Sequence, residues 1–138
     1  MLENLGKVAF IVMGEAEGQS YKEKVYVASV LWNRLYRKKE LRFNPIEIDF
    51  HGWSRQIDKI DTKEERQAFI DSVNASYEAH ENLAKYNDIF FFHTKIPKRK
   101  PSSFYETIKV ENFETDKFAH DFFKIPLGKD GFYKVKRK

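Results

Sequence analysis

The stretch GEAEGQSYKEKVYVASVLWNR, residues 14–34, decides how the first part of the chain folds. Upstream of it, apolar residues in 2–16 recur at helical spacing and also occupy the other faces, which predicts a helix that is buried all round. Gly18 is a natural stop for that helix. Ser20 and Glu23 have the spacing of a capping box, so a second helix with apolar positions is expected to begin at once.

A third helix and two strands are predicted after a loop-like region. Thr62 and Glu65 form another capping box, and the helix that follows is expected to turn apolar residues toward the core. These residues are Phe69, Ile70, Val73 and Tyr77, with Leu83 as a further candidate. Residues 89–93 and 104–110 then have the composition of strands, and we expect them to pair as a hairpin. The predicted fold is a mainly α-helical α+β domain with a small β-hairpin.

The composition is that of one folded domain. The chain has 138 residues, of which 41% are hydrophobic and 16% aromatic, enough for a sizeable core. It has no cysteine, which excludes disulfides, thiolate metal sites and a cysteine nucleophile. The longest apolar run, residues 8–13, is too short to span a membrane. The N-terminus lacks the pattern of a signal peptide, so we expect synthesis in a cytoplasm.

Positive charge is concentrated at the C-terminal end. Residues 124–138 hold six basic residues and one acidic residue, a sum of +5, whereas residues 1–123 sum to −1. We therefore expect a folded domain at 1–123 and a basic tail at 124–138. A second basic cluster lies at residues 95–100. Both clusters are interpreted either as exposed patches for an anionic partner or as solvated ends.

Glu15 breaks the electrostatic rules of the first predicted helix. It lies near the C-terminal end of that helix, where the helix dipole disfavours a carboxylate, and Ile11 and Val12 are apolar neighbours one turn earlier. Lost hydration and the negative helix end are both expected to raise its pKa, which suits a general acid. Glu17 adds repulsion if the two carboxylates approach each other. The alternative is that Glu15 reaches solvent past the helix end and has no chemical role.

The opening segment resembles the start of the SleB-like cell-wall hydrolase family. In that family a GEARGE segment leads into a helix that reads roughly VAxVxLNR. Here residues 14–20 read GEAEGQS, and residues 25–34 read VYVASVLWNR. This block carries the resemblance.

Later segments follow the family's order along the chain. Trp53 and Ser54, with Asp58 four residues after the serine, resemble its aromatic-Ser segment with a following acid. Residues 90–92 resemble its aromatic triplet, and residues 120–123 resemble its closing HxFF pattern. The resemblance thus covers about residues 8–123.

The resemblance implies a lysozyme-like fold and cleavage of the β-1,4 bond between N-acetylmuramic acid and N-acetylglucosamine in peptidoglycan. The catalytic glutamate of the family corresponds to Glu15. The chain departs from the family at Glu17, which replaces an arginine, and at His93 and Thr94, which replace Asn-Pro after the aromatic triplet. These departures affect the expected substrate contacts and leave the role of Glu15 in place.

Two mechanisms remain open for such an enzyme. A lytic transglycosylase needs only Glu15, which protonates the leaving oxygen and then accepts the proton of the muramic acid C6 hydroxyl. A hydrolytic muramidase would use a second carboxylate on the opposite face of the sugar. Asp58 is the candidate for that second role, ahead of Asp49 and Asp61, although an acid there is also typical of a turn.

Four further residues are candidates for contacting the sugar. Ser54 offers a hydroxyl, Trp53 and Phe91 offer rings that can stack on a sugar, and His93 offers an imidazole. Each has a structural alternative, namely a turn hydroxyl for the serine, core packing for the rings and a fold-supporting role for the histidine. The histidines show no metal-ligand spacing, so neither a metal nor another cofactor is expected.

The expected partner is the glycan strand of peptidoglycan, and the basic tail is expected to draw the protein to anionic envelope polymers. A compact domain without a readable leader is typical of a phage endolysin, which accumulates in the cytoplasm of the producing cell and reaches the wall at lysis. We expect a monomer with no nucleic-acid partner. The rival interpretations are a nucleic-acid-binding module, motivated by the basic clusters, and a catalytically silent glycan-binding domain.

Overall fold

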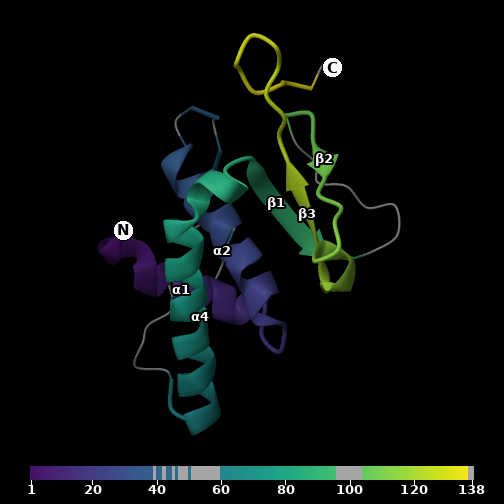
Figure 1. The fold of residues 1–138 in the computed structure, drawn as a ribbon. Helices are drawn as coiled ribbons and strands as arrows, with labels where there is room; N and C mark the ends of the chain where they lie inside the picture. The colour runs from purple at the N-terminus through teal and green to yellow at the C-terminus, as the bar shows by residue number, and fades with distance from the viewer. Residues whose placement is uncertain are drawn as a thin grey trace.

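A layer of helices packs on one side of a small antiparallel sheet (Figure 1). The structure is a computed structural model that describes residues 1–38, 40–41, 43–44, 46, 50, 60–95 and 104–136. The elements are α1 (Leu2–Glu15), α2 (Tyr21–Tyr36), α4 (Lys63–Glu81), η3 (Leu83–Tyr86), β1 (Ile89–Thr94), β2 (Ile108–Lys109), η4 (Thr115–Lys117) and β3 (His120–Lys124). The chain is a small, mainly α-helical α+β domain, as predicted. No helix in its described part has the length and apolar character needed to cross a membrane.

The middle of α1 is buried because residues 8–12 are all apolar. This confirms the prediction of a buried helix, although both helix ends are more accessible. The helix ends at Glu15, and the backbone N–H of Ala16 still donates to the carbonyl of Val12. Gly18 then adopts a φ of +75°, a left-handed conformation that glycine takes without strain. That residue allows the chain to turn directly into α2.

The central helix of the fold is α2, which contacts the other two long helices and β1. Its residues 23–34 are all buried. Trp32 is completely buried, and its Nε1 donates to the carbonyl of Ser76 in α4 at 2.9 Å. Asn33 Nδ2 donates to two backbone carbonyls, at 2.7 and 2.9 Å, where η3 leads into β1. The polar groups of this helix therefore hold the neighbouring backbone in place.

The N-terminus of α4 has the predicted capping box. Thr62 Oγ1 accepts the N–H of Glu65 at 3.0 Å, and the Thr62 N–H donates to Glu65 Oε1 at 3.3 Å. The prediction for its core-facing side is wrong in part, since Ile70 and Tyr77 are 50% and 48% exposed. Small residues form the buried face instead: Ser72, Ala75, Ser76 and Ala79. Short side chains let α4 lie close against α2, and this packing overrides the apolar pattern of the sequence.

The strands lie in the order β1-β3-β2, and both pairs are antiparallel. The predicted pairing of residues 89–93 with 104–110 is therefore wrong, because β3 separates the two strands. The first four residues of β3, 120–123, are all buried. A strand of this kind can occupy the middle of a sheet, where both of its faces are covered.

The two faces of the sheet have different surroundings. Phe92 and Phe122 lie opposite each other on β1 and β3 and belong to the main core with α1 and α2. His93 lies opposite Asp121 on the other face, because successive residues of a strand alternate between faces. That outer face carries polar side chains together with aromatic ones.

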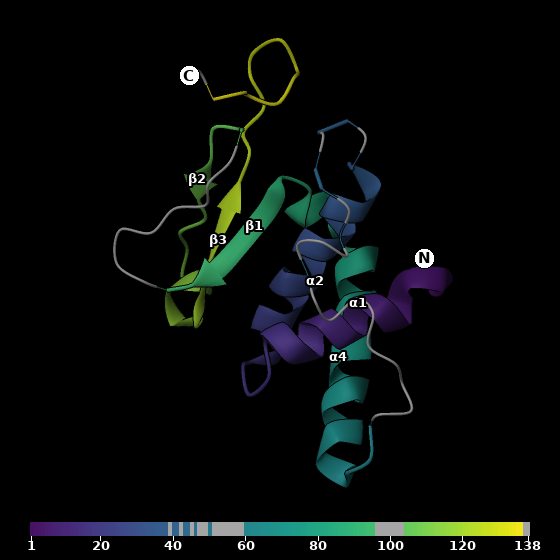
Figure 2. The ribbon, with the colours of Figure 1, turned by 180° about the vertical axis from the view of Figure 1, so that it is seen from behind.

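The chain after β3 folds back onto the domain. Ile125 is completely buried with Leu41 and Phe90 in a second, smaller core cluster, and Tyr133 packs against the same cluster. The segment, drawn in yellow, extends from the end of β3 and closes a loop before the C-terminus (Figures 1 and 2). The stretch that the sequence analysis separates as a basic tail, residues 124–138, is thus folded against the body over its described part.

Candidate functional site

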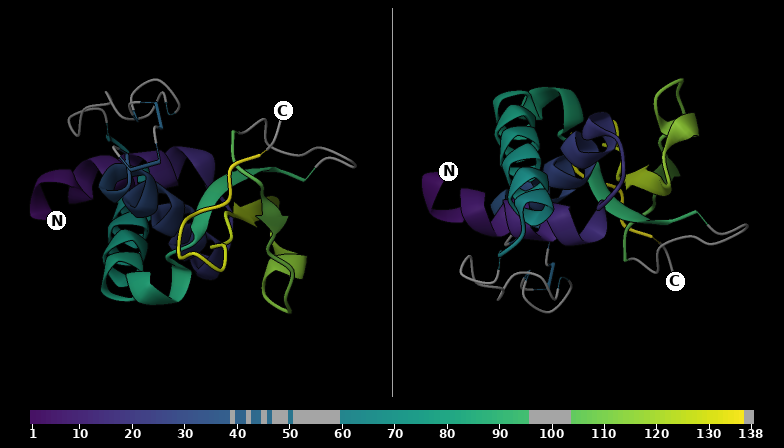
Figure 3. Two further views of the ribbon diagram at one scale, coloured as in Figure 1. Left: turned by 90° about the horizontal axis from the view of Figure 1, so that it is seen from above. Right: turned by 90° about the horizontal axis from the view of Figure 1, so that it is seen from below.

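Glu15 is the last residue of α1 and is exposed. The last turn of α1 has no basic residue, so no cation in that turn offsets the negative end of the helix dipole beside this carboxylate. The C-terminal end of α1 points toward the sheet, on the side where β1 ends (Figures 1 and 3). The position predicted for Glu15, at the end of a buried helix, is confirmed.

The predicted loss of hydration at Glu15 is wrong for the free protein. Ile11 and Val12 are 1% and 0% exposed, whereas Glu15 lies past them in solvent. Glu17 is exposed as well, so both carboxylates of this turn are open to water. A residue at the end of a helix can therefore be exposed even when the residues one turn earlier are buried. Any desolvation of Glu15 has to come from a bound molecule.

The side chain of Glu23 departs from the predicted capping box. Ser20 Oγ accepts the N–H of Glu23 at 3.2 Å, as predicted, but the Glu23 carboxylate points elsewhere. It accepts the N–H of Ala119 at 2.9 Å and lies 2.6 Å from His120 Nδ1. Glu23 and His120 are only 1% and 7% exposed. A carboxylate and an imidazole thus share a nearly dry site that holds the first turn of α2 to the start of β3.

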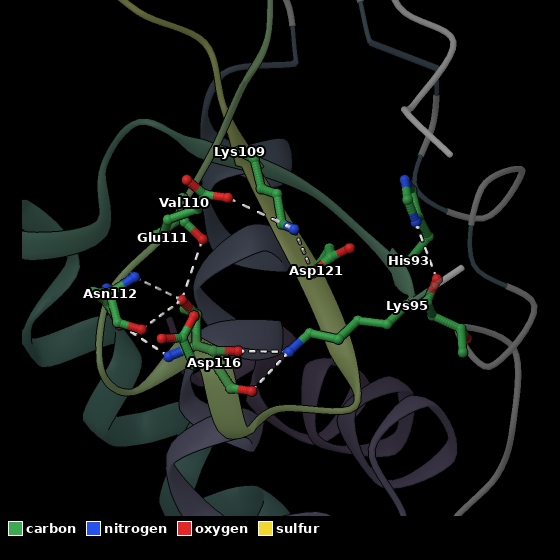
Figure 4. A network of polar contacts seen from close by, with 10 residues as sticks. His93, Lys95, Lys109, Val110, Glu111, Asn112, Asp116 and Asp121 are labelled. Carbon is green, nitrogen blue, oxygen red and sulfur yellow. Dashed lines mark hydrogen bonds and ion pairs between the residues drawn. The ribbon is translucent and has the colours of Figure 1, made fainter. Parts of the chain in front are cut away.

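The loop between β2 and β3 is fixed by further polar contacts (Figure 4). Tyr26 Oη donates to Glu114 Oε2 at 3.0 Å, and burial raises the pKa of the Tyr26 phenol. Asn112 Oδ1 accepts two backbone N–H groups at the start of η4, both at 2.9 Å. Lys95 Nζ donates to two carbonyls of η4 at 2.8 and 3.1 Å. Lys95, predicted as part of an exposed basic patch, therefore binds the backbone of this loop.

Phe91 and His93 lie two residues apart on β1 and share the outer face of the sheet. The guanidinium carbon of Arg34 lies 5.3 Å from the centroid of the Phe91 ring. The His93 ring lies 4.9 Å from the ring of Phe123, and its buried Nε2 has no hydrogen-bond partner among the described residues. Both rings pack against protein, and their contact with a substrate stays a prediction.

Charged groups continue along the outer face of the sheet beside His93 (Figure 4). Asp121, directly across the strands from His93, is 8% exposed. Its carboxylate lies 3.6 Å from Lys109 Nζ, which also lies 3.8 Å from a carboxylate oxygen of Glu111. The lysine of β2 thus balances the largely buried carboxylate of β3.

Several predicted site residues lie outside the described residues. These are Trp53, Ser54 and Asp58, together with the less favoured Asp49. Asp61 is described and exposed, and its backbone carbonyl accepts Arg66 Nη1 at 2.7 Å beside the start of α4. The second carboxylate of a hydrolytic mechanism therefore stays a prediction.

The structure brings the described candidates together only in part. Phe91 and His93 share one strand face, whereas Glu15 makes no hydrogen bond or ion pair with the described residues. The pairing of Glu23 with His120 is not predictable from the sequence, because the spacing from Ser20 already accounts for Glu23 as a capping residue. No cluster of acidic and histidine side chains that could hold a metal ion occurs within the described ranges.

Comparison with known proteins adds no further assignment. No family model matches the chain, and neither a curated protein nor a solved structure matches it.

Proposed function

We propose that this protein cleaves the β-1,4 glycosidic bonds of peptidoglycan with Glu15 as its catalytic acid. The observation that carries the proposal is the placement of Glu15, exposed at the C-terminal end of a buried helix whose end points toward the sheet. The resemblance of residues 14–34 to the opening block of cell-wall hydrolases supports the same residue. A small, mainly α-helical domain with one sheet is compatible with a lysozyme-like enzyme.

Glu15 can act as a general acid once a glycan strand covers its carboxyl group. A bound sugar removes water from Glu15, while the end of α1 keeps its negative pole beside the carboxylate. Both effects favour the protonated form, which can donate to the glycosidic oxygen as the bond to the anomeric carbon breaks. The positive charge that develops on the ring is then quenched by an oxygen nucleophile.

In the transglycosylase route that nucleophile is the C6 hydroxyl of the same muramic acid. Glu15, ionised after the first step, accepts the hydroxyl proton as the oxygen bonds to the anomeric carbon. The product has a 1,6-anhydro end, no water is consumed, and the carboxyl group returns to its starting form. In the alternative hydrolytic route Asp58 assists on the opposite face and the product has a reducing end.

Two neighbouring glutamates give a matched test of this proposal. We expect Glu15→Gln to lower the rate of peptidoglycan solubilisation by about 100-fold or more, because the amide cannot donate the required proton. Glu17→Gln removes another exposed carboxylate from the same turn and is expected to keep most of the activity. Unfolding transitions of both variants should match that of the original protein. A Glu15→Gln variant that clears purified sacculi at the original rate would remove Glu15 from the chemistry.

The released fragments distinguish the two routes. We expect mass spectrometry to find muropeptides with 1,6-anhydro ends, which are lighter by one water than their hydrolysed counterparts. Fragments with reducing ends alone would contradict the transglycosylase route and assign the second role to Asp58. Sacculi that bind the protein but release no fragments would indicate a silent glycan-binding domain.

A further inference from the structure

The loop between β2 and β3, residues 110–119, buries one of its two phenylalanines and exposes the other. Phe118 is 6% exposed and packs edge-on against the Tyr26 ring, with 5.1 Å between the ring centroids. Phe113 is 76% exposed, so its ring adds little to the core and stays in contact with water. We call this segment the β2–β3 loop. Its exposed ring is available to a bound molecule.

Polar contacts hold the backbone on both sides of Phe113 (Figure 4). The N–H of Asn112 donates to Thr115 Oγ1 at 3.0 Å. Asn112 Oδ1 accepts the N–H groups of Glu114 and Thr115, both at 2.9 Å. Lys95 Nζ donates to two carbonyls of η4 at 2.8 and 3.1 Å. A side chain on a backbone that is already fixed loses less conformational entropy when a ligand covers it.

A cation lies over one face of the Phe113 ring. Lys117 Nζ is 4.2 Å from the ring centroid, and the attraction between the ammonium group and the ring stabilises this arrangement. Phe113 remains largely exposed with the lysine in place, so the opposite face of the ring is open to solvent. The two residues together offer a flat apolar surface beside a group that donates hydrogen bonds.

The β2–β3 loop is connected to the helix that follows the Glu15 turn. Lys22, in the first turn of α2, has its Nζ 3.6 Å from Glu114 Oε1, and Tyr26 Oη donates to Glu114 Oε2 at 3.0 Å. Glu114 directly follows Phe113 in the chain. The turn between α1 and α2 also lies toward the same end of the sheet as η4 (Figures 1 and 2). A long strand bound at the Glu15 turn can therefore extend to the β2–β3 loop.

The composition of the β2–β3 loop favours a neutral sugar over other ligands. Residues 110–118 contain three acidic residues and one lysine, which disfavours a nucleic acid or an anionic lipid. Phe113 is the one large apolar residue that this described loop exposes, whereas a stable protein interface covers about 800 Å² on each partner. An N-acetylated pyranose carries no charge. It can place its C–H face on an aromatic ring and direct its hydroxyl groups to nearby charged side chains.

We propose that Phe113 and Lys117 form a sugar-binding subsite for the glycan strand of peptidoglycan. The inference rests on the function proposed above, because it assigns a further contact of the same substrate. The Phe113 ring lies against the C–H face of one N-acetylated sugar, and Lys117 Nζ donates to a hydroxyl or carbonyl oxygen of the strand. Phe113 thus contributes to binding, while proton transfer belongs to Glu15.

The first test measures binding without cleavage. The Glu15→Gln protein is titrated with the soluble β-1,4-linked tetramer of N-acetylglucosamine, so that the affinity is measured without loss of the ligand. We expect additional Phe113→Ala to weaken binding about tenfold, and additional Lys117→Gln to weaken it about threefold. The matched control is additional Phe132→Ala, because this phenylalanine is 74% exposed in the C-terminal segment. It should leave the affinity unchanged.

The second test separates binding from chemistry and from stability in the protein with Glu15 intact. Phe113→Ala should raise the concentration of sacculi that gives half the maximal rate, and it should leave the maximal rate within about twofold. Its unfolding transition should match those of Phe132→Ala and the original protein. Phe113→Trp keeps an aromatic face, so it should bind the tetramer like the original residue. Its added emission should shift to the blue on binding, whereas that of Phe132→Trp should not.

The outcomes distinguish this subsite from the proposed catalysis. The subsite is refuted if Glu15→Gln does not bind the tetramer, or if additional Phe113→Ala binds it as well as the Phe132→Ala control. It is also refuted if sacculi are solubilised with the same half-saturating concentration by Phe113→Ala and the original protein. Binding of the tetramer that depends on Phe113, in a protein that releases no fragments from sacculi, would keep the subsite and refute the catalysis.

Discussion

Burial of a carboxylate costs free energy because the charge loses its water, and Glu23 is almost completely buried, at 1% exposure. Its carboxylate loses water and gains the N–H of Ala119 and the Nδ1 of His120 in return, at 2.9 and 2.6 Å. Removal of such a carboxylate leaves both of these groups buried without their partner. At the scale of single residues, this contact is a polar link between α2 and the middle strand of the sheet.

We therefore predict that Glu23→Ala lowers the free energy of unfolding by about 3 kcal/mol. Glu23→Gln should cost less, because an amide can still accept the Ala119 N–H and can donate to an unprotonated His120 Nδ1. Urea denaturation measures both. The control is Glu81→Ala, an exposed glutamate at the end of α4, for which we expect a change within about 0.5 kcal/mol. Equal behaviour of Glu23→Ala and the control would show that the buried contact contributes no net stability.

At the scale of elements, the sequence predicts the helices, because their positions depend on signals within a few neighbouring residues. The helices could be found because caps such as Thr62 and Ser20 and the apolar periodicity act within a few residues. The order of strands could not, because β2 has only two residues and β1 pairs with β3, which comes after β2 in the chain. The prediction of the buried face of α4 is wrong in part because that face is decided by packing between helices. Small residues are buried where α4 lies close against α2, and no signal within α4 indicates this.

The position of β3 between β1 and β2 leads to a prediction about its side chains. Phe122 is completely buried, so Phe122→Ala should lower the free energy of unfolding by about 4 kcal/mol. Ile108→Ala, in the edge strand β2, should cost less than about 1 kcal/mol because that side chain is 45% exposed. Denaturation curves of the two variants give the comparison. Similar losses would contradict the central position of β3.

At the scale of the whole molecule, the sequence predicts only those parts of the candidate site that lie within a single helix or strand. The helix end that carries Glu15 could be located from residues 14–20 alone, whereas the exposure of that side chain depends on how α1 packs. The contact between Glu23 and His120 joins segments far apart in the sequence, so no local pattern indicates it. The basic composition of residues 124–138 suggests a tail, but composition does not show that a residue within it, Ile125, is completely buried.

The body of the protein and its C-terminal segment should therefore unfold together. Ile125 is completely buried beside Phe90, and its N–H donates to the carbonyl of Asp88 at 2.9 Å, so Ile125→Ala should lower the free energy of unfolding by about 3 kcal/mol. Leu127 lies two residues further on and is 50% exposed, so Leu127→Ala should change the free energy of unfolding by less than about 1 kcal/mol. Chemical denaturation followed by far-UV circular dichroism and by tryptophan fluorescence should give one coincident transition for each variant. If Ile125→Ala were as stable as Leu127→Ala, the segment after β3 would contribute nothing to the stability of the body.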